Sequence, residues 1–245
     1  MLTPAEEALL TEGTSRLGFT LSPMQLKQFA GYRALLLDWN TRVNLTRIVD
    51  PTQVLTRHFL DSLTVVLALP DDASEKALRV IDVGAGAGLP GLALCIAFPA
   101  WRVASLDSVG KKTRFVVAVA AALDLDGVSV LHARAEDAAH DPAHRETYDL
   151  CLARAVAPLD VLVEYTAPFC RVGGLVVAMK KGGVHAEVVG ARRAAGQMGG
   201  RIEALVPVPE IADLGDDRVL VPIRKVQPTR ADLPRQAGLP SRKPL

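Results

Sequence analysis

The stretch Asp82–Gly91, Asp-Val-Gly-Ala-Gly-Ala-Gly-Leu-Pro-Gly, decides how the fold of this chain is interpreted. It overlaps the end of a short apolar run, Leu78–Val83, which is typical of a buried strand. Three alternating glycines then allow the backbone to turn tightly and to approach a ligand closely. Pro90 suits the first turn of a helix. We therefore expect a strand, a glycine-rich loop and a helix in this order.

Beyond this loop, short apolar runs alternate with helical segments, which predicts a parallel sheet covered by helices on both faces. The expected strands are Leu78–Val83, Trp101–Leu106, Val128–Leu131, Tyr148–Ala153 and Gly174–Met179. The expected helices are Leu89–Phe98, Lys111–Leu123, Leu159–Phe169 and Val184–Met198. Two late apolar runs, Ile202–Val208 and Arg218–Arg224, have no long helix between them, so we expect a closing hairpin-like pair.

The chain divides into three parts by pattern. Residues 1–74 are helical in periodicity, with Ser22 and Pro23 as an N-cap and first helical residue and with Pro51 opening a later helix. Residues 75–226 carry the alternating strands and helices. Residues 227–245 form a basic tail containing Pro228, Pro234, Pro240 and Pro244, which we expect to be extended rather than packed.

Composition places the chain among ordinary globular proteins, because 49% of its 245 residues are hydrophobic and 22% are charged. No apolar run approaches the roughly 18 residues of a membrane span, and no basic segment typical of a secretory signal precedes Glu6. Three widely spaced cysteines suit neither a disulfide framework nor a metal site. We therefore expect a cytoplasmic, metal-free protein with buried thiols, and we expect it to be a monomer.

Two cofactor classes use a glycine loop of this kind. Gly86–Gly91 matches the dinucleotide pattern G-x-G-x-x-G, which alone is weak support. Asp82 favours the other class, because a carboxylate at the base of the loop repels a pyrophosphate but suits the cationic S-adenosylmethionine. Asp107, 25 residues later at the end of the next strand, suits the ribose hydroxyls of an adenosine. A dinucleotide, or a turn without a ligand, remains the alternative at this point.

Asp82–Gly91 also resembles the corresponding stretch of the bacterial glucose-inhibited division protein B family, the small-subunit rRNA guanine-N7 methyltransferases. Further similar blocks follow in register along nearly the whole chain. They are Trp39-Asn40, Asn44–Thr46, His58–Ser62, Leu106–Ser108, Gly110–Lys112, Arg114-Phe115, Arg134–Glu136, Ala153–Ala155, Ala157-Pro158 and the Pro234–Leu245 tail. One block departs from the family pattern of Lys-Gly after the fifth strand, because this chain has Lys180-Lys181-Gly182.

The resemblance implies an α/β, Rossmann-like class I methyltransferase fold: a mostly parallel seven-stranded sheet with an antiparallel closing strand, plus N-terminal helices. It implies methyl transfer from S-adenosylmethionine to N7 of a guanine in 16S rRNA, with the rRNA or the small ribosomal subunit as partner. The implied donor contacts are Gly84, Gly86, Gly88, Leu89, Asp107, Ser108, Ala135, Glu136 and Arg154. The implied substrate contacts are His58, Lys111, Lys112, Arg114, Lys180, Arg235, Arg242 and Lys243.

Several of these residues also have structural explanations. Glu136 suits a helix N-terminus, and Asp107 suits a strand-end cap. Arg154 suits a surface ion pair, His58 suits packing within a helix, and the basic tail suits a solubilising role. The residues alone also leave open a small-molecule methyltransferase on the same fold or an NAD-dependent oxidoreductase. No catalytic proton-transfer residue is expected, because the neutral guanine N7 carries a lone pair and no proton.

Overall fold

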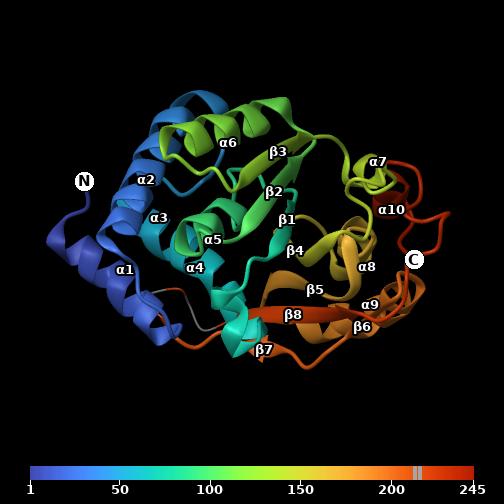
Figure 1. Cartoon of the computed structure of the whole chain (residues 1–245). Helices are drawn as coiled ribbons and strands as arrows, with labels where there is room; N and C mark the ends of the chain where they lie inside the picture. The colour runs from blue at the N-terminus through green and yellow to red at the C-terminus, as the bar shows by residue number, and fades with distance from the viewer. Residues whose placement is uncertain (212–213, 215–216) are drawn as a thin grey trace.

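The structure is a computed structural model that describes residues 1–211, 214 and 217–245. Within these residues one sheet has eight strands, in the order β3-β2-β1-β4-β5-β8-β6, with the two-residue β7 also paired to β8 (Figure 1). The parallel strands are β1 (Arg79–Val83), β2 (Arg102–Asp107), β3 (Val128–His132), β4 (Tyr148–Arg154) and β5 (Cys170–Lys181). The strand β8 (Arg218–Lys225) pairs antiparallel with β5, and the short strands β6 (Gly200–Ile202) and β7 (Val206–Pro207) each pair antiparallel with β8. The predicted mostly parallel sheet with an antiparallel closing strand is confirmed. The described sheet has eight strands rather than the predicted seven, because two short strands, β6 and β7, stand where one strand was expected.

Side-chain alternation along the strands builds two hydrophobic layers. In β1, Val80 faces one layer and Ile81 the other; in β4, Leu152 and Cys151 divide in the same way. Buried side chains of α5 (Gly91–Ala97) and α6 (Gly110–Ala122) belong to the first layer, and those of α8 (Leu159–Thr166) and α9 (Val184–Gln197) to the second. Helices therefore cover both faces of the sheet, as the sequence predicts (Figure 1).

The N-terminal helices begin where their capping residues predict. Thr3 and Glu6 form a capping box for α1 (Pro4–Arg16), and Ser22 with Gln25 forms one for α2 (Pro23–Val43). The third segment is continuous but irregular. It comprises α3 (Pro51–Val54), the π-helical η1 (Leu55–Leu60), α4 (Asp61–Leu63) and the 3₁₀-helical η2 (Thr64–Ala68), and η3 (Asp71–Glu75) follows it.

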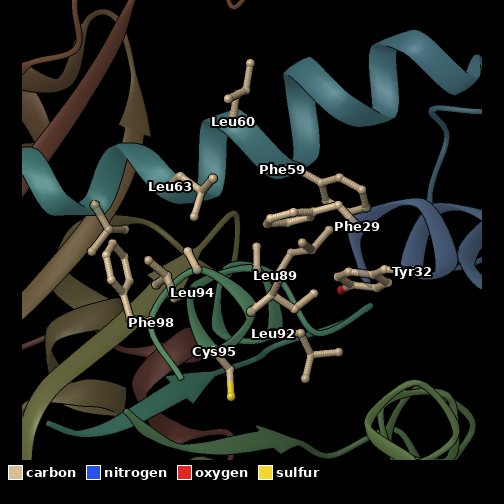
Figure 2. Close-up of a cluster of buried hydrophobic side chains, with 14 of the residues drawn as sticks. Phe29, Tyr32, Phe59, Leu60, Leu63, Leu89, Leu92, Leu94, Cys95 and Phe98 are labelled. Carbon is tan, nitrogen blue, oxygen red and sulfur yellow. The ribbon is translucent and has the colours of Figure 1, made fainter. Parts of the chain in front are cut away.

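These helices support the glycine loop from one side. Figure 2 shows Phe29, Tyr32 and Phe59 packed around Leu89 and Leu92, which follow the loop. Tyr32 and Phe59 stack with their ring centroids 4.9 Å apart, and the Tyr32 hydroxyl donates a hydrogen bond to the carbonyl oxygen of Ala87. Burying each such side chain contributes about 1.5–3 kcal/mol, so the loop rests on a firmly packed base.

The C-terminal tail is packed against the core, so the prediction that it is extended is wrong. Leu233 is buried in the second hydrophobic layer, and Arg235 donates hydrogen bonds to both carboxylate oxygens of the fully buried Glu164. Arg145 donates to the backbone oxygens of Thr229, Arg230 and Leu233. A short helix, α10 (Leu239–Arg242), lies near α7 (Ala135–Ala138) and α8 (Figure 1). These polar contacts outweigh the extended tendency of the prolines.

The cysteines and the absence of a membrane span were also expected from the composition, and both can be compared with the described residues. Cys95, Cys151 and Cys170 are free, buried thiols. Among the helices that the structure describes, none is long and apolar enough to cross a membrane. The division into residues 1–74, 75–226 and 227–245 stays a prediction.

Candidate functional site

The glycine loop has a backbone that favours glycine at three alternating positions. The φ angles of Gly84, Gly86 and Gly88 are 73°, 60° and 83°, in the left-handed region that costs other residues about 1–2 kcal/mol. The N–H groups of Gly84 and Ala85 both donate to the carbonyl oxygen of Leu106. The loop therefore folds over the end of β2 and leaves a hollow beside it.

Asp82 lies beneath the loop rather than in this hollow. Its Oδ2 accepts a hydrogen bond from the N–H of Gly91 at 2.8 Å, and its buried Oδ1 has no partner among the described residues. Burial raises the pKa of Asp82 to about 7, against the opposing effects of the Gly91 hydrogen bond and of Arg154. The carboxyl thus anchors the start of α5 and is not part of the lining of the pocket beside the loop.

The loop's hydrogen bonds also bear on the dinucleotide alternative. A pyrophosphate in that fold binds free N–H groups at the N-terminus of the following helix. Here the N–H of Gly91 is taken by Asp82, the N–H groups of Gly88 and Leu89 donate to Ala85, and Pro90 has no N–H. The phosphate-binding donors of a dinucleotide site are therefore already engaged within the protein.

A pocket of about 250 Å³, which we name the loop pocket, opens beside the loop at the carboxyl ends of β1, β2 and β4. Such strand ends are where open α/β sheets bind ligands. Its lining residues are Val83, Gly84, Leu106, Asp107, Ser108, Val109, Lys112, Ala133, Arg134, Ala135, Glu136, Ala155, Val156 and Tyr165. It therefore brings together five of the predicted donor contacts: Gly84, Asp107, Ser108, Ala135 and Glu136.

Asp107 organises one wall of the loop pocket. Its Oδ2 accepts from the N–H of Gly86 at 2.9 Å, and its Oδ1 accepts from the N–H of Val109 at 2.8 Å. Lys112 Nζ lies 3.6 Å from Oδ2. Because a carboxylate offers about four acceptor positions, Asp107 retains capacity for two hydroxyl donors from a ligand.

Glu136 and Tyr165 also line the loop pocket. Glu136 is buried, and its Oε1 accepts from the N–H of Gly238 in the tail at 2.8 Å. Burial raises the pKa of the Tyr165 hydroxyl, and Glu136 adds to this effect. The tail therefore fixes the Glu136 carboxylate at the edge of the pocket.

Four predicted donor contacts lie outside the lining of the loop pocket. Gly86 reaches it through its hydrogen bond to Asp107. A Cβ at Gly88 would come within 2.5 Å of Leu92 and 3.1 Å of the Tyr32 hydroxyl, so this glycine allows close packing in the core. Leu89 is buried in the same cluster (Figure 2). Arg154 lines a neighbouring pocket instead.

This neighbouring pocket, which we name the arginine pocket, has a volume of about 370 Å³. Its lining residues are Ile48, Arg57, His58, Asp61, Thr64, Arg154, Ala155, Met179, Lys180, Lys181, Val208, Arg218, Val219 and Leu220. Ala155 lines both pockets, so they adjoin at the end of β4. Asp61 pairs with Arg154 through Oδ2 and with Arg218 through Oδ1, each at 2.9 Å.

His58 lies in the arginine pocket, and its Nε2 is 2.8 Å from the Thr46 hydroxyl. Burial lowers the pKa of His58 to about 4, and the positive charges of Arg154 and Arg218 add to this effect. The imidazole is therefore neutral near pH 7. Asn44, from the same block of the resemblance, is the left-handed C-cap of α2.

The predicted basic contacts separate into three locations. Lys112 lines the loop pocket, whereas Lys111 and Arg114 are exposed in the first turns of α6. Lys180 lines the arginine pocket and donates to the carbonyl oxygen of Ala157 and to Glu187. In the tail, Arg242 and Lys243 are exposed, but Arg235 is occupied by Glu164.

Sequence reasoning missed Tyr165, Val156, Asp61 and Arg218 as pocket residues. Tyr165 lies on α8, where it resembled an ordinary core position. Arg218 begins β8 and reaches Asp61 from 157 positions away in the chain. Asp61 was within a quoted block, His58–Ser62, and a carboxylate at a buried helical position is the signal that could have identified it.

Solved structures share this architecture at low sequence identity. A variant of the 16S rRNA (adenine(1408)-N(1))-methyltransferase from Catenulisporales acidiphilia, solved with its cosubstrate SAM, matches with a TM-score of 0.50 and 16% identity, covering 65% of this chain and 90% of that one. The Methanococcus jannaschii fibrillarin pre-rRNA processing protein matches with a TM-score of 0.50 and 14% identity, covering 66% and 73%. These similarities show the class I methyltransferase fold.

Sequence relatives are much closer. The Ribosomal RNA small subunit methyltransferase G of Roseiflexus castenholzii (strain DSM 13941 / HLO8) is 48% identical over 93% of this chain and 95% of its own length. The protein of the same name from Dehalococcoides mccartyi (strain CBDB1) is 44% identical over 96% and 98%. The family model described as rRNA small subunit methyltransferase G matches residues 25–209. The chain therefore belongs to the rRNA small subunit methyltransferase G family.

Proposed function

We propose that this enzyme transfers a methyl group from S-adenosylmethionine to N7 of a guanine in 16S rRNA. The observation that carries the proposal is the loop pocket, built from a glycine loop and the Asp107 carboxylate, in a chain of this family. Neither the small-molecule methyltransferase nor the NAD-dependent oxidoreductase fits the family. The occupied N–H groups at the start of α5 further argue against a dinucleotide.

The residues of the loop pocket fit the methyl donor. Gly86 faces open space, because an added Cβ would have only the Gly84 oxygen nearby, at 3.9 Å. Asp107 has unused acceptor capacity for the two ribose hydroxyls. Ala135 and Glu136 are placed to contact the edge of the adenine. The Oε1 of Glu136 accepts the hydrogen bond from Gly238, and its Oε2 is the oxygen available to the adenine. Gly84 and Ser108 complete the proposed donor contacts.

Lys112 extends the proposed donor site, because it lies against Asp107 within the loop pocket. It therefore belongs with the donor contacts rather than with RNA. Gly88, Leu89 and Arg235 act in our proposal through packing and support, since their contacts are internal to the protein. Gly86 acts through the hydrogen bond that holds Asp107.

Chemistry at N7 requires little from the protein beyond position. When bound, S-adenosylmethionine supplies an electrophilic methyl group on a cationic sulfur. The guanine N7 lone pair forms a bond to the methyl carbon as the carbon–sulfur bond breaks, and the bonding pair leaves on sulfur. No proton is removed from N7 in this step, so no general base is needed. The two adjoining pockets hold the reactants side by side, and this proximity is the catalytic contribution.

The RNA must present its guanine outside a regular helix. The A-form major groove is too narrow for side chains, so the target lies in a loop or is unstacked. The exposed cations Lys111 and Arg114, and Arg242 and Lys243 in the tail, are the proposed phosphate contacts. We propose that the enzyme acts as a monomer. Because its substrate is ribosomal RNA, we place it in the cytoplasm.

Labelled methyl transfer tests this function. Purified protein is incubated with S-adenosylmethionine labelled in the methyl group and with small ribosomal subunits or their naked rRNA, from a strain lacking this activity. We expect label in the rRNA of at least one substrate. Absence of label from both, under conditions where calorimetry shows donor binding, would refute the proposal.

A further inference from the structure

The arginine pocket combines apolar faces with a polar cluster at the carboxyl ends of β4 and β5. Ile48, Met179, Val208, Val219 and Leu220 supply the apolar part of its lining. The polar part centres on Asp61, which is 4% exposed and lies between two guanidinium groups. A pocket with apolar walls and a small number of fixed polar groups suits a flat, polar-edged ligand.

The Asp61 cluster presents a hydrogen-bond acceptor beside a donor. Asp61 Oδ2 accepts a hydrogen bond from Arg154, and Oδ1 forms an ion pair with Arg218 at 2.9 Å; both oxygens retain capacity for a further hydrogen bond. Arg154 and Arg218 each have five N–H donors and use only some of them on Asp61, Arg57 and Leu214. The two arginines also hold the carboxylate in one orientation, which is the condition for selective recognition.

We propose that the arginine pocket receives the target guanine, with Asp61 accepting hydrogen bonds from guanine N1–H and N2–H while Arg154 or Arg218 donates to guanine O6. This inference rests on the proposed function and names the residues that select its base. Enzymes that act on a base commonly hold it, turned out of the stack, by its Watson–Crick edge and between apolar side chains. N7 lies on the base's other edge and stays free to face the loop pocket.

The same cluster discriminates against adenine. Guanine presents an N–H donor at N1 beside an acceptor at O6, which matches Asp61 beside an arginine. Adenine presents the reverse, an acceptor at N1 beside an N6 donor, and so places like groups opposite each other. A site built to pair a polar edge rejects a ligand that leaves its buried groups unpaired.

The surroundings of the cluster suit an RNA-bound base. Ala155 lines both pockets, so a base in the arginine pocket adjoins the donor site. Arg57 and Lys181 are exposed lining residues of the arginine pocket and are available to the phosphates that flank the base. Because His58 is neutral, it adds no third positive charge to those of Arg154 and Arg218. This limits the repulsion between the arginine pocket and the cationic methyl donor proposed for the loop pocket beside it.

Binding of mononucleotides tests the inference without requiring catalysis. Dissociation constants of GMP, IMP and AMP are measured by calorimetry on the protein saturated with S-adenosylhomocysteine. IMP lacks only the N2 amino group. We expect wild-type protein to bind GMP at least tenfold more tightly than IMP, and IMP more tightly than AMP. Equal dissociation constants for the three nucleotides in the wild type would overturn the assignment.

An Asp61→Asn variant sharpens the test, with Asp149→Asn as its matched control. Like Asp61, Asp149 accepts a hydrogen bond from an arginine, in this case Arg171. It also accepts one from the backbone N–H of Arg79, and it lies at the start of β4, at the other end of the strand from Arg154. We expect Asp61→Asn to lose the preference for GMP over IMP and to retain S-adenosylhomocysteine affinity within twofold, whereas Asp149→Asn retains both. Unchanged GMP preference, or a tenfold loss of S-adenosylhomocysteine affinity, would overturn the proposal.

The outcome is separable from that of the proposed function. If Asp61→Asn does not fold, the wild-type comparison of GMP, IMP and AMP still decides. If wild-type protein labels rRNA but binds the nucleotides equally, the function stands and this assignment fails. If it prefers GMP but labels no rRNA, the pocket assignment stands and the proposed function fails.

Discussion

Asp107 accepts a hydrogen bond from the N–H of Gly86 at 2.9 Å, which joins the end of β2 to the glycine loop. We predict that Asp107→Ala lowers S-adenosylhomocysteine affinity at least tenfold, because hydrogen bonds to a charged group contribute about 1.5–3 kcal/mol each. The variant also loses about 1–3 kcal/mol of stability, since the N–H groups of Gly86 and Val109 lose their acceptor. Calorimetry and urea unfolding measure the two effects.

Asp149→Ala is the control for this change. Asp149 accepts a hydrogen bond from the N–H of Arg79 at 2.7 Å, so its replacement by alanine also removes a hydrogen bond to the backbone. Unlike Asp107, Asp149 does not line the loop pocket. Its affinity for S-adenosylhomocysteine should equal that of the wild type. An Asp107→Ala protein that binds as tightly as the wild type would show that the donor does not use this carboxylate.

Substitution at Gly84 should separate donor binding from backbone strain. Gly84 and Gly18 both have positive φ, 73° and 88°, so alanine at either position costs about 1–2 kcal/mol. A Cβ at Gly84 would come within 2.7 Å of Val156, a residue of the loop pocket, whereas a Cβ at Gly18 would meet nothing within 4 Å. We expect only Gly84→Ala to weaken donor binding tenfold or more in calorimetry. Equal affinity in both variants contradicts the placement of the donor.

The tail should stabilise the fold through Arg235. Arg235→Ala leaves the fully buried Glu164 carboxylate without its guanidinium partner, which costs about 3–5 kcal/mol. Arg230→Ala breaks the exposed Arg230–Asp232 pair, whose side chains are 70% and 62% exposed, and should cost at most about 1 kcal/mol. Urea unfolding compares the variants. Similar, small losses in both would mean that the tail contact contributes little.

Asp82 should make stability depend on pH. Burial raises its pKa in the folded state from the ordinary value of 3.8 to about 7, so the folded state binds the proton more tightly than the unfolded state. Its contribution to stability is therefore fully present below about pH 4 and is lost as pH rises to about 7, by at most about 4 kcal/mol.

Asp82→Asn removes this titration while retaining an acceptor for the Gly91 N–H. We predict that the stability of the variant relative to the wild type increases from pH 5 to pH 8, as measured by urea unfolding. His58, whose pKa is lowered to about 4, titrates in both proteins and cancels from the difference. A difference that is constant with pH rules out a protonated Asp82 in the folded state.

Charge reversal should separate RNA binding from donor binding. Lys111→Glu combined with Arg114→Glu changes two exposed residues of α6. We expect methyl transfer to rRNA to fall tenfold or more, and the dependence on salt to weaken, because phosphate contacts are lost. Donor affinity should change less than twofold. The control is the double reversal of Lys76 and Arg102, two exposed residues near the amino ends of β1 and β2, which should leave methyl transfer intact. Equal effects of the two pairs would argue against an RNA-binding face on α6.

Most of the fold could be predicted because it follows from local periodicity. Val80 and Ile81, or Leu152 and Cys151, alternate between two layers, and such alternation is visible in the sequence. Capping residues such as Ser22 likewise mark a helix start locally. The packed tail could not be predicted, since the Arg235–Glu164 contact joins residues 71 positions apart and overrides the extended tendency of the prolines.

The residues of the candidate site could be predicted from the sequence where their positions at the carboxyl ends of strands bring them together. Asp107 ends β2 and Gly84 follows β1; these strands are parallel neighbours whose carboxyl ends lie side by side, and both residues line the loop pocket. The direction of each side chain was not predictable. Asp82 points beneath the loop, and Leu89 points into the core, because packing against Gly91 and Tyr32 decides between the two sides of the loop.

The position of the transferred methyl group tests the central claim most directly. Small-subunit rRNA from the labelling reaction is digested to nucleosides, and the labelled product is identified by chromatography and mass spectrometry. We predict that the label resides in 7-methylguanosine, in the wild type and in the Asp149→Ala control. Label in any other nucleoside would contradict the proposed chemistry, as would unlabelled rRNA from a protein that binds the donor.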